Sequence, residues 1–308
     1  MRINISSFIA LAVAASSVAA QSSKRLVSIN PPSSQNKRVD LTALPPVDIT
    51  PVTNAKRFAQ GLPPISPVKR HPHRGGPHRD GGNHHRGTRV TFAPRAETSS
   101  SPTVNVKCNI LVKSSDDSTL GYISPVFNDD GEYGTPQSSQ TGALEVSFSN
   151  TTTSGSIIGP LDLLVTNNAD TINSFPYLSA AMGFMSDGDD LGPGNANYVV
   201  ITGNSASTGS GATPSNSTDN SYVTRTGMSA NSETAIWTYN PATQDIRGLW
   251  TNTDGSSVPI KLVYYMETDN TGGDGNTLIA TGDVAAFREP FGCTDTCPEI
   301  TFTCVPPV

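Results

Sequence analysis

The stretch that decides the fold runs from residue 233 to residue 266 and reads ETAIWTYNPATQDIRGLWTNTDGSSVPIKLVYYM. It contains three short apolar runs, and the two tryptophans of the chain, Trp237 and Trp250, lie in the first and the second of them. The dipeptides that separate the runs are Asn240-Pro241 and Asp254-Gly255, both typical of tight turns. The pattern predicts a meander of three antiparallel strands.

This meander has one strongly apolar face, because side chains alternate between the two sides of a strand. Trp237 and Tyr239 share a face in the first run. In the third run the shared face consists of Ile260, Leu262, Tyr264 and Met266. Three strands cannot bury such a face alone, so other strands must pack on it.

Residues 104–308 contain further runs of the same kind. A helix over residues 178–185 is the competing interpretation for one of them, but Gly183 and the following sequence SDGDDLGPG argue against it. We therefore predict an all-β fold without helices, an antiparallel β-sandwich or barrel of about ten to twelve strands. The other predicted strands are residues 104–112, 143–149, 161–165, 198–202, 222–226, 277–287 and 300–305.

Residues 1–20 have the pattern of a secretory signal peptide. Arg2 precedes an apolar run at residues 8–15, and the small residues at 18–20 favour cleavage after Ala20. No later stretch approaches the roughly 20 apolar residues that a membrane-spanning helix needs. We expect a secreted, extracellular protein without a membrane span.

The charge of the remaining chain divides near residue 103. Residues 21–103 carry 13 Lys and Arg against 4 Asp and Glu, whereas residues 104–308 carry 6 against 22. The first segment is rich in Pro, Ser, Gly, Arg and His, and it has too few apolar residues to offset chain entropy. We predict a disordered basic pro-segment or linker at 21–103 and an acidic folded domain at 104–308.

Four Lys-Arg pairs lie in the basic segment. Such pairs in a flexible secreted segment resemble the substrates of kexin-type proprotein convertases, which cleave after the pair. The alternative is that these residues only keep the segment solvated. The predicted cleavage positions follow Arg25, Arg38, Arg57 and Arg70.

All five histidines lie within residues 71–85. Flexible imidazoles collect divalent metal weakly, and a solvated linker is the competing interpretation. Cleavage after Arg70 would make His71 an amino terminus, which resembles the copper brace of fungal polysaccharide monooxygenases in that one residue. The folded domain supplies no second His, so we predict no cofactor. Nucleic-acid binding is not expected, because Phe58 and Phe92 are the only aromatic residues of the segment.

The four cysteines are Cys108, Cys293, Cys297 and Cys304. An exported chain keeps them oxidised, and the domain has neither a Cys-x-x-Cys motif nor a His to support a zinc site. Three pairings are open. We favour a bridge from Cys108 to the C-terminal cluster, which joins the first and last strands, with the other two cysteines paired locally.

Two N-glycosylation sequons begin at Asn150 and Asn216. Both lie in polar turns, which suits glycosylation of exposed loops. Sequons also arise by chance in Ser- and Thr-rich chains, so their occupancy is a prediction.

The absence of certain residue types limits the catalytic mechanisms that the domain can use. Residues 104–308 contain no His, which excludes Ser-His-Asp and Cys-His mechanisms and imidazole-bound catalytic zinc. Two carboxylates on facing strands could still cleave a glycosidic bond. An acidic residue is more often part of a solvated strand face. The candidates are Glu145, Glu233, Glu267, Glu289 and Glu299.

Three acidic loops have the oxygen-rich, Gly-containing composition that calcium uses. The same residues are common turn formers, and the full spacing of a calcium-binding loop is absent, so no metal is assigned. The weak candidates are Asp187, Asp189 and Asp190, residues 128–132, and residues 269–274.

Six short motifs are spread over most of the chain: RFAQGLPP (57–64), EYG (132–134), AIW (235–237), TNTDGS (251–256), TGDVAAF (281–287) and TFTCVPP (301–307). With the signal peptide and the Lys-Arg-studded segment, they resemble a group of uncharacterised secreted proteins of mushroom-forming fungi. The resemblance implies export and one C-terminal β-domain, and it implies no activity. The C-terminal cysteines are not part of it.

Three hypotheses for function remain. We favour a non-enzymatic binding or cell-wall-associated protein with a processed leader, for which carbohydrate is the candidate partner. One alternative is a carboxylate-dependent extracellular hydrolase, and another is a precursor of kexin-released peptides. A cleft with two carboxyl groups about 5 to 10 Å apart favours the hydrolase, whereas an exposed aromatic platform or a flat surface favours binding.

Overall fold

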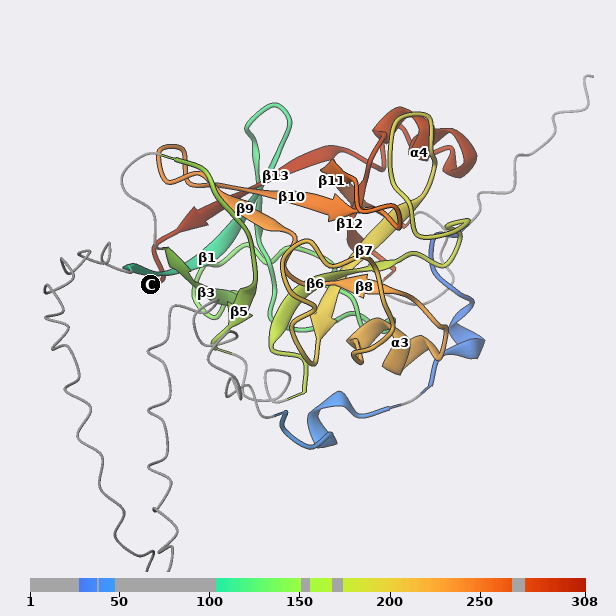
Figure 1. The fold of residues 1–308 in the computed structure, drawn as a ribbon, viewed down its shortest axis with the longest axis horizontal. Coiled ribbons are helices and arrows are strands. Elements are labelled where there is room, and N and C mark those ends of the chain that lie inside the picture. Colours follow the sequence, from blue (N-terminus) through green and yellow to red (C-terminus); the bar gives the residue numbers. More distant parts are fainter. Residues whose placement is uncertain (1–27, 38, 48–103, 151–155, 168–173, 268–274) are drawn as a thin grey trace, which may run out of the picture.

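The computed structural model describes residues 28–37, 39–47, 104–150, 156–167, 174–267 and 275–308. Its thirteen strands form one antiparallel sheet that folds over on itself like a β-sandwich, which confirms the all-β prediction (Figure 1). The strands are β1 (Val104–Ser114), β2 (Thr119–Tyr122), β3 (Glu145–Asn150), β4 (Ile158–Leu161), β5 (Leu163–Val165), β6 (Tyr177–Met182), β7 (Tyr198–Asn204), β8 (Ser232–Glu233), β9 (Trp237–Tyr239), β10 (Asp245–Thr251), β11 (Ser257–Tyr265), β12 (Thr277–Thr281) and β13 (Glu299–Val305). The helices are α3 (Ser221–Thr226) and α4 (Val284–Phe291), and two 3₁₀ turns, η1 (Ser33–Gln35) and η2 (Leu41–Ala43), precede the sheet.

The strand order explains how the sheet encloses a core. It runs β2-β1-β3-β5-β6-β7-β12-β11-β13-β10-β9-β4, with β8 beside β6. Because β13 pairs with β1 as well as with β10 and β11, distant parts of the sheet meet and the strands surround a shared interior. The predicted meander is present, since Gly248 of β10 lies opposite Trp237 of β9 and Ile260 of β11.

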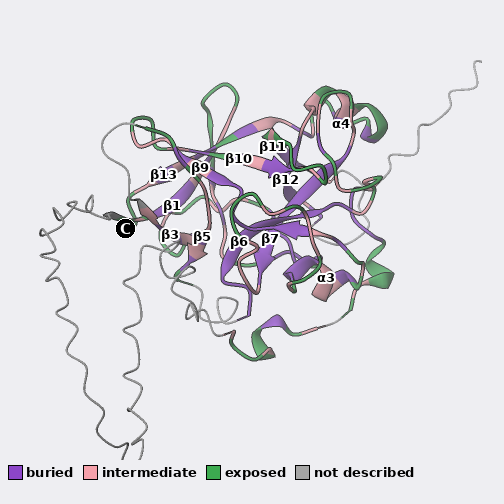
Figure 2. Ribbon diagram, in the orientation of Figure 1, coloured by how far each residue is buried: buried purple, intermediate pink, exposed green. Residues whose placement is uncertain are grey.

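Two apolar clusters lie on opposite faces of the central strands. On β7, Val199 and Ile201 belong to the main core, whereas Tyr198 and Val200 belong to the second cluster. The strands β6 and β7 are buried along their whole length for this reason (Figure 2). Side chains from α3, from α4 and from Ile29 complete the second cluster.

Two short helices occupy positions that were predicted as strands. Residues 222–226 belong to α3, so that prediction is wrong. The predicted strand 277–287 is correct for residues 277–281, which form β12, and wrong for residues 284–287, which belong to α4. Capping outweighs strand propensity at both sites. Asn220 Oδ1 accepts from the Val223 amide (2.8 Å) and Gly227 ends α3 with φ 72°, while Asp283 and Gly292 cap α4 in the same way. No helix in the described ranges has the length and apolar character needed to cross a membrane.

A stretch of the basic segment is packed against the domain. In residues 28–37 and 39–47, which we call the leader segment, Ile29 is 0% exposed and Leu41 is 2% exposed. This corrects the prediction that residues 21–103 stay unfolded throughout. The composition of the segment could not reveal its docking, because the partners that satisfy its few apolar and amide groups lie in the domain. The prediction for residues 21–27, 38 and 48–103 lies outside the described residues.

The disulfide pattern agrees with the favoured pairing. Cys108 of β1 bonds to Cys304 of β13, and Cys293 bonds to Cys297. The first bridge joins the two strands that bring distant parts of the sheet together. The second closes the short turn after α4.

Candidate functional site

A tight turn over residues 128–132 presents two acidic side chains to the same space. Asn128 Oδ1 accepts from the backbone amides of Asp130 (3.0 Å) and Glu132 (2.9 Å). Gly131 has φ 82°, and a Cβ there would lie 2.3 Å from the Ser221 carbonyl oxygen, so only glycine fits this turn. The carbonyl of Gly131 accepts from Ser221 Oγ (2.6 Å), which fastens the turn to the start of α3.

The carboxylates of Asp130 and Glu132 share one amide donor. Asn30 Nδ2 lies 3.1 Å from Asp130 Oδ2 and 3.2 Å from Glu132 Oε2. These two oxygens are therefore within about 6 Å of each other, the length of two hydrogen bonds. Asn36 Nδ2 donates to Asp130 Oδ1 (2.6 Å) and Asn128 Nδ2 donates to Glu132 Oε2 (3.0 Å). We call Asp130 and Glu132 the acid pair.

Burial changes the protonation of the acid pair. Glu132 is 0% exposed, and burial, followed by the nearby charge of Asp130, raises its pKa to about 8. Burial also raises the pKa of Asp130, against the opposing effect of the hydrogen bond from Asn36. Near neutral pH Glu132 thus carries a proton. The buried Oδ1 atoms of Asn30 and Asn36 accept no hydrogen bond in the described part of the chain.

Tyr222 of α3 lies between the acid pair and the surface pocket described next. Its side chain is fully buried, and burial, then the charges of Glu132, Tyr198 and Asp130, raises the pKa of the phenol above its ordinary value. The hydroxyl lies beside the backbone of Phe184 but makes no hydrogen bond of ordinary geometry. It stays neutral and able to donate.

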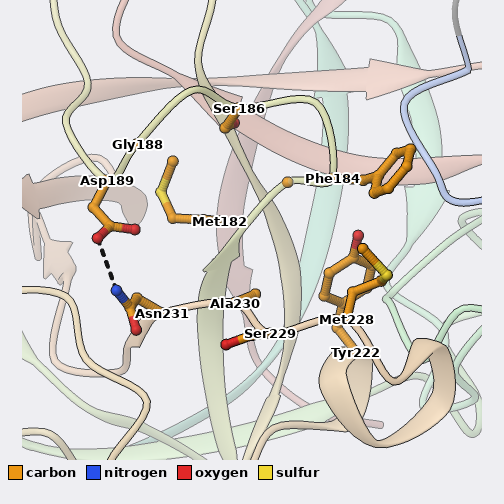
Figure 3. Close-up of a pocket in the computed structure, with 11 residues that line it drawn as sticks. Met182, Phe184, Ser186, Gly188, Asp189, Tyr222, Met228, Ser229, Ala230 and Asn231 are labelled. Atoms are coloured by element: carbon orange, nitrogen blue, oxygen red, sulfur yellow. Dashed lines mark hydrogen bonds between the residues drawn. The ribbon is translucent and has the colours of Figure 1, made fainter.

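A small pocket of about 180 Å³ lies at the ends of β6 and α3. Asp189 and Asn231 are hydrogen-bonded to each other (2.7 Å) on one side, and Phe184, Met228 and Tyr222 lie on the other (Figure 3). Tyr222 therefore contributes to both the pocket and the surroundings of the acid pair.

The carboxylates singled out from the sequence do not form a pair. Glu145 binds Lys107 (2.7 Å), Glu299 lies 3.5 Å from Lys261, and Glu289 is exposed on α4. These three side chains fit the alternative interpretation, in which an acidic residue belongs to a solvated face of the protein.

Glu233 differs from the others. It is 3% exposed, both of its carboxylate oxygens accept from the backbone amide of Thr251 (3.2 Å each), and burial raises its pKa to about 8. Glu267, at the end of β11, is half-buried, and its backbone amide donates to Asn276 Oδ1. Among the described residues, Glu233 makes no hydrogen bond with Asp130 or Glu132.

The acidic loops do not assemble a metal site in the described residues, where no cluster of three His, Cys, Asp or Glu side chains occurs. Asp189 is bonded to Asn231, and Asp190 accepts from Thr253 (2.7 Å), so their carboxylates point to different partners. The backbone amide of Asp187 donates to Asn197 Oδ1, and the Asp187 carbonyl accepts from Asn197 Nδ2. The loop at 269–274 lies outside the described residues.

The predicted processing positions also fall outside the described residues. These are Ala20, Arg25, Arg38, Arg57 and Arg70. Asn150 ends β3, and the rest of its sequon is not described, whereas Asn216 is exposed in the loop before α3. Glycosylation at both stays a prediction.

The acid pair was missed as a chemical site in the sequence. The composition of residues 128–132 indicates a turn and a weak calcium candidate, and no local signal links them to Asn30, which is 100 residues from Asp130. No family model, curated protein or solved structure matches this chain.

Proposed function

We propose that this protein is an extracellular hydrolase of the carboxylate type, with Asp130 and Glu132 as its reactive groups. The observation that carries the proposal is the single amide of Asn30 donating to both carboxylates. The contact shows that two acids of different environment lie close together, as general acid–base hydrolysis requires, and the turn at Asn128, which belongs to the domain, holds them in place. The bridging amide belongs to the leader segment, so the site as described is covered.

The raised pKa of Glu132 assigns the roles. Glu132, protonated near neutral pH, gives its proton to the leaving oxygen of a glycosidic bond. Asp130 acts as the nucleophile, a role that requires its ionised form, and water then completes the hydrolysis while the proton returns to Glu132. A spacing of about 6 Å or less lies close to that of retaining glycosidases.

Export and maturation are part of the same proposal. Two disulfides, no membrane-crossing helix in the described ranges and a basic leader with four Lys-Arg pairs support secretion and cleavage by a kexin-type protease. Such cleavage is the natural means of removing the leader segment from the acid pair.

The test is hydrolysis of a panel of polysaccharides by the secreted chain, before and after cleavage with a kexin-type protease. Activity is expected only after cleavage. E132Q and D130N are expected to lower the rate at least about 100-fold, while E299Q, at an exposed ion pair, leaves it unchanged. Equal activity of E132Q and the parent chain would refute the assignment.

A second candidate is a carbohydrate-binding protein, and the pocket at Asp189 favours it. A carboxylate and an amide at the rim of a shallow pocket are groups that hydrogen-bond sugar hydroxyls. The aromatic platform expected for this class is absent among the described residues, whose large exposed apolar side chains are aliphatic or Met. Glycan-array binding that is lost in D189A, without hydrolysis, would favour this candidate over the hydrolase.

A further inference from the structure

The leader segment is held by two separate apolar anchors. Ile29 lies in the second cluster with Tyr198 and Phe287, and its carbonyl accepts from the Tyr198 hydroxyl. Leu41 lies in the main core, with Val39 packed against the same cluster. The segment therefore packs into both apolar clusters of the domain.

Between the anchors, polar bonds join the segment to the acid pair and to α3. Asn30 and Asn36 donate to the two carboxylates as described above. The amide of Lys37 donates to the carbonyl of Arg225 (2.6 Å), and the Lys37 side chain packs over Gly227. The segment passes alongside α3 in Figure 1, where it is blue.

The Lys-Arg pairs lie at different positions relative to the two anchors. Lys37-Arg38 lies between the two anchors, whereas the pairs ending at Arg57 and Arg70 lie beyond the second anchor and before β1. A cut after Arg57 or Arg70 would separate the segment from the domain in the chain and would break none of the contacts above. A cut after Arg38 would separate the anchor at Ile29 from the anchor at Leu41.

The backbone amide and carbonyl of Lys37, the residue before Arg38, are both hydrogen-bonded. The Lys37 amide is bonded to Arg225, and the Lys37 carbonyl accepts from the amide of Val39 (2.8 Å). A protease that binds its substrate as an extended strand needs these backbone groups free. The docked segment must therefore open locally before Lys37-Arg38 can be cleaved.

We propose that the domain has a peptide-binding groove whose occupant is its own leader segment, held non-covalently after cleavage at Arg57 or Arg70 and released only when Arg38 is cut. The groove takes a polypeptide that places an aliphatic side chain in the second cluster and an adjacent carboxamide on the acid pair. This inference rests on the proposed function in one respect: release uncovers the pair Asp130 and Glu132. The groove and the order of cleavage stand on the contacts alone.

The test follows the full secreted chain during digestion with a kexin-type protease, by mass spectrometry of the fragments. Cleavage after Arg57 or Arg70 is expected at least about tenfold faster than after Arg38, because the latter waits for local opening. During this interval the fragment that carries residues 28–47 should co-elute with the domain in native size-exclusion chromatography. Equal rates at Arg38 and Arg57, or immediate loss of the fragment, would overturn the proposal.

Two variants separate docking from simple misfolding. I29A removes most of one anchor and is expected to speed cleavage after Arg38 at least about tenfold, whereas S33A, at an exposed position of η1, leaves all rates unchanged. Fluorescence of the buried Trp237 and Trp250 confirms that the domain stays folded in each variant. If I29A unfolds the domain, N30A replaces it, and unchanged rates in a folded variant contradict the proposal. Turnover is not measured, so a chain without hydrolase activity still gives a clear result.

Discussion

The side-chain amide of Asn30 lies 3.2 Å from Glu132 Oε2, although the two residues are 102 positions apart in the chain. The same amide reaches Asp130 at 3.1 Å. One residue of the leader segment thus contacts both acids.

Replacing Asn30 by Ala removes the shared donor and leaves two buried carboxyl groups with fewer partners. We expect N30A to lower the unfolding free energy by about 1–3 kcal/mol. Urea denaturation of the uncleaved chain measures this loss, and S33A in the same segment serves as the unperturbed control. A change in N30A no larger than that in S33A would show that the contact contributes nothing.

Stability is expected to fall as the pH rises from about 4.5 to about 8. Burial raises the pKa of Glu132 from 4.5 to about 8 and that of Glu233 likewise, so in this interval the folded protein holds protons that the unfolded chain has lost. The stabilisation is complete below the unfolded-state pKa and is lost as the pH passes the folded-state pKa, with a slope of up to about 1.4 kcal/mol per pH unit for each group. Denaturation at pH 4.5, 6 and 8 measures it.

The two glutamates provide matched controls for this pH dependence. E132Q and E233Q each remove one titrating group and should each reduce the slope. Only E132Q should also change how firmly the leader fragment is held after cleavage, because Glu233 is bonded to Thr251 instead. Equal effects of both variants on fragment retention would show that the acid pair does not contribute to binding of the leader fragment.

The sequence predicted those features whose signal is local. Alternation identified the strands that contain Trp237 and Ile260, and a bridge from Cys108 to the C-terminal cluster followed from the expectation that the first and last strands adjoin. The short helix α3 was missed because its Tyr, Val and Thr residues favour strands, whereas the cap at Asn220 decides the outcome.

The acid pair could not be predicted for a different reason. Residues 128–132 show only a turn-forming acidic sequence, and the property that makes them chemically interesting is their burial by a segment that is distant in the chain. The five candidate Glu residues are solvated, half-buried or bonded elsewhere, since alternation reports which face a side chain takes and not what lies opposite.

Removal of the two disulfides should have very different effects. The bridge Cys108–Cys304 spans 196 residues and Cys293–Cys297 spans 4. In the chain-entropy model the long bridge stabilises by about 5 kcal/mol and the short one by about 2 kcal/mol. The double variants C108A/C304A and C293A/C297A, compared by thermal unfolding, should show the larger loss in the first. The opposite order would indicate that strand pairing between β1 and β13 already restricts the unfolded chain.

Gly131 should be the least replaceable residue of the turn that carries the acid pair. Its φ of 82° is in the left-handed region, and a Cβ would lie 2.3 Å from the backbone oxygen of Ser221, which cannot move without shifting α3. Gly188 is a matched control, because its φ of 95° is comparable and nothing lies within 4 Å of the added Cβ. Backbone strain alone should cost G188A about 1–2 kcal/mol. G131A adds the overlap with Ser221 and should lose clearly more stability in urea denaturation, together with faster cleavage after Arg38, since Asp130 and Glu132 would no longer meet Asn30. Equal losses in the two variants would mean that the turn can shift away from α3 freely, and the acid pair would then not be fixed by the fold.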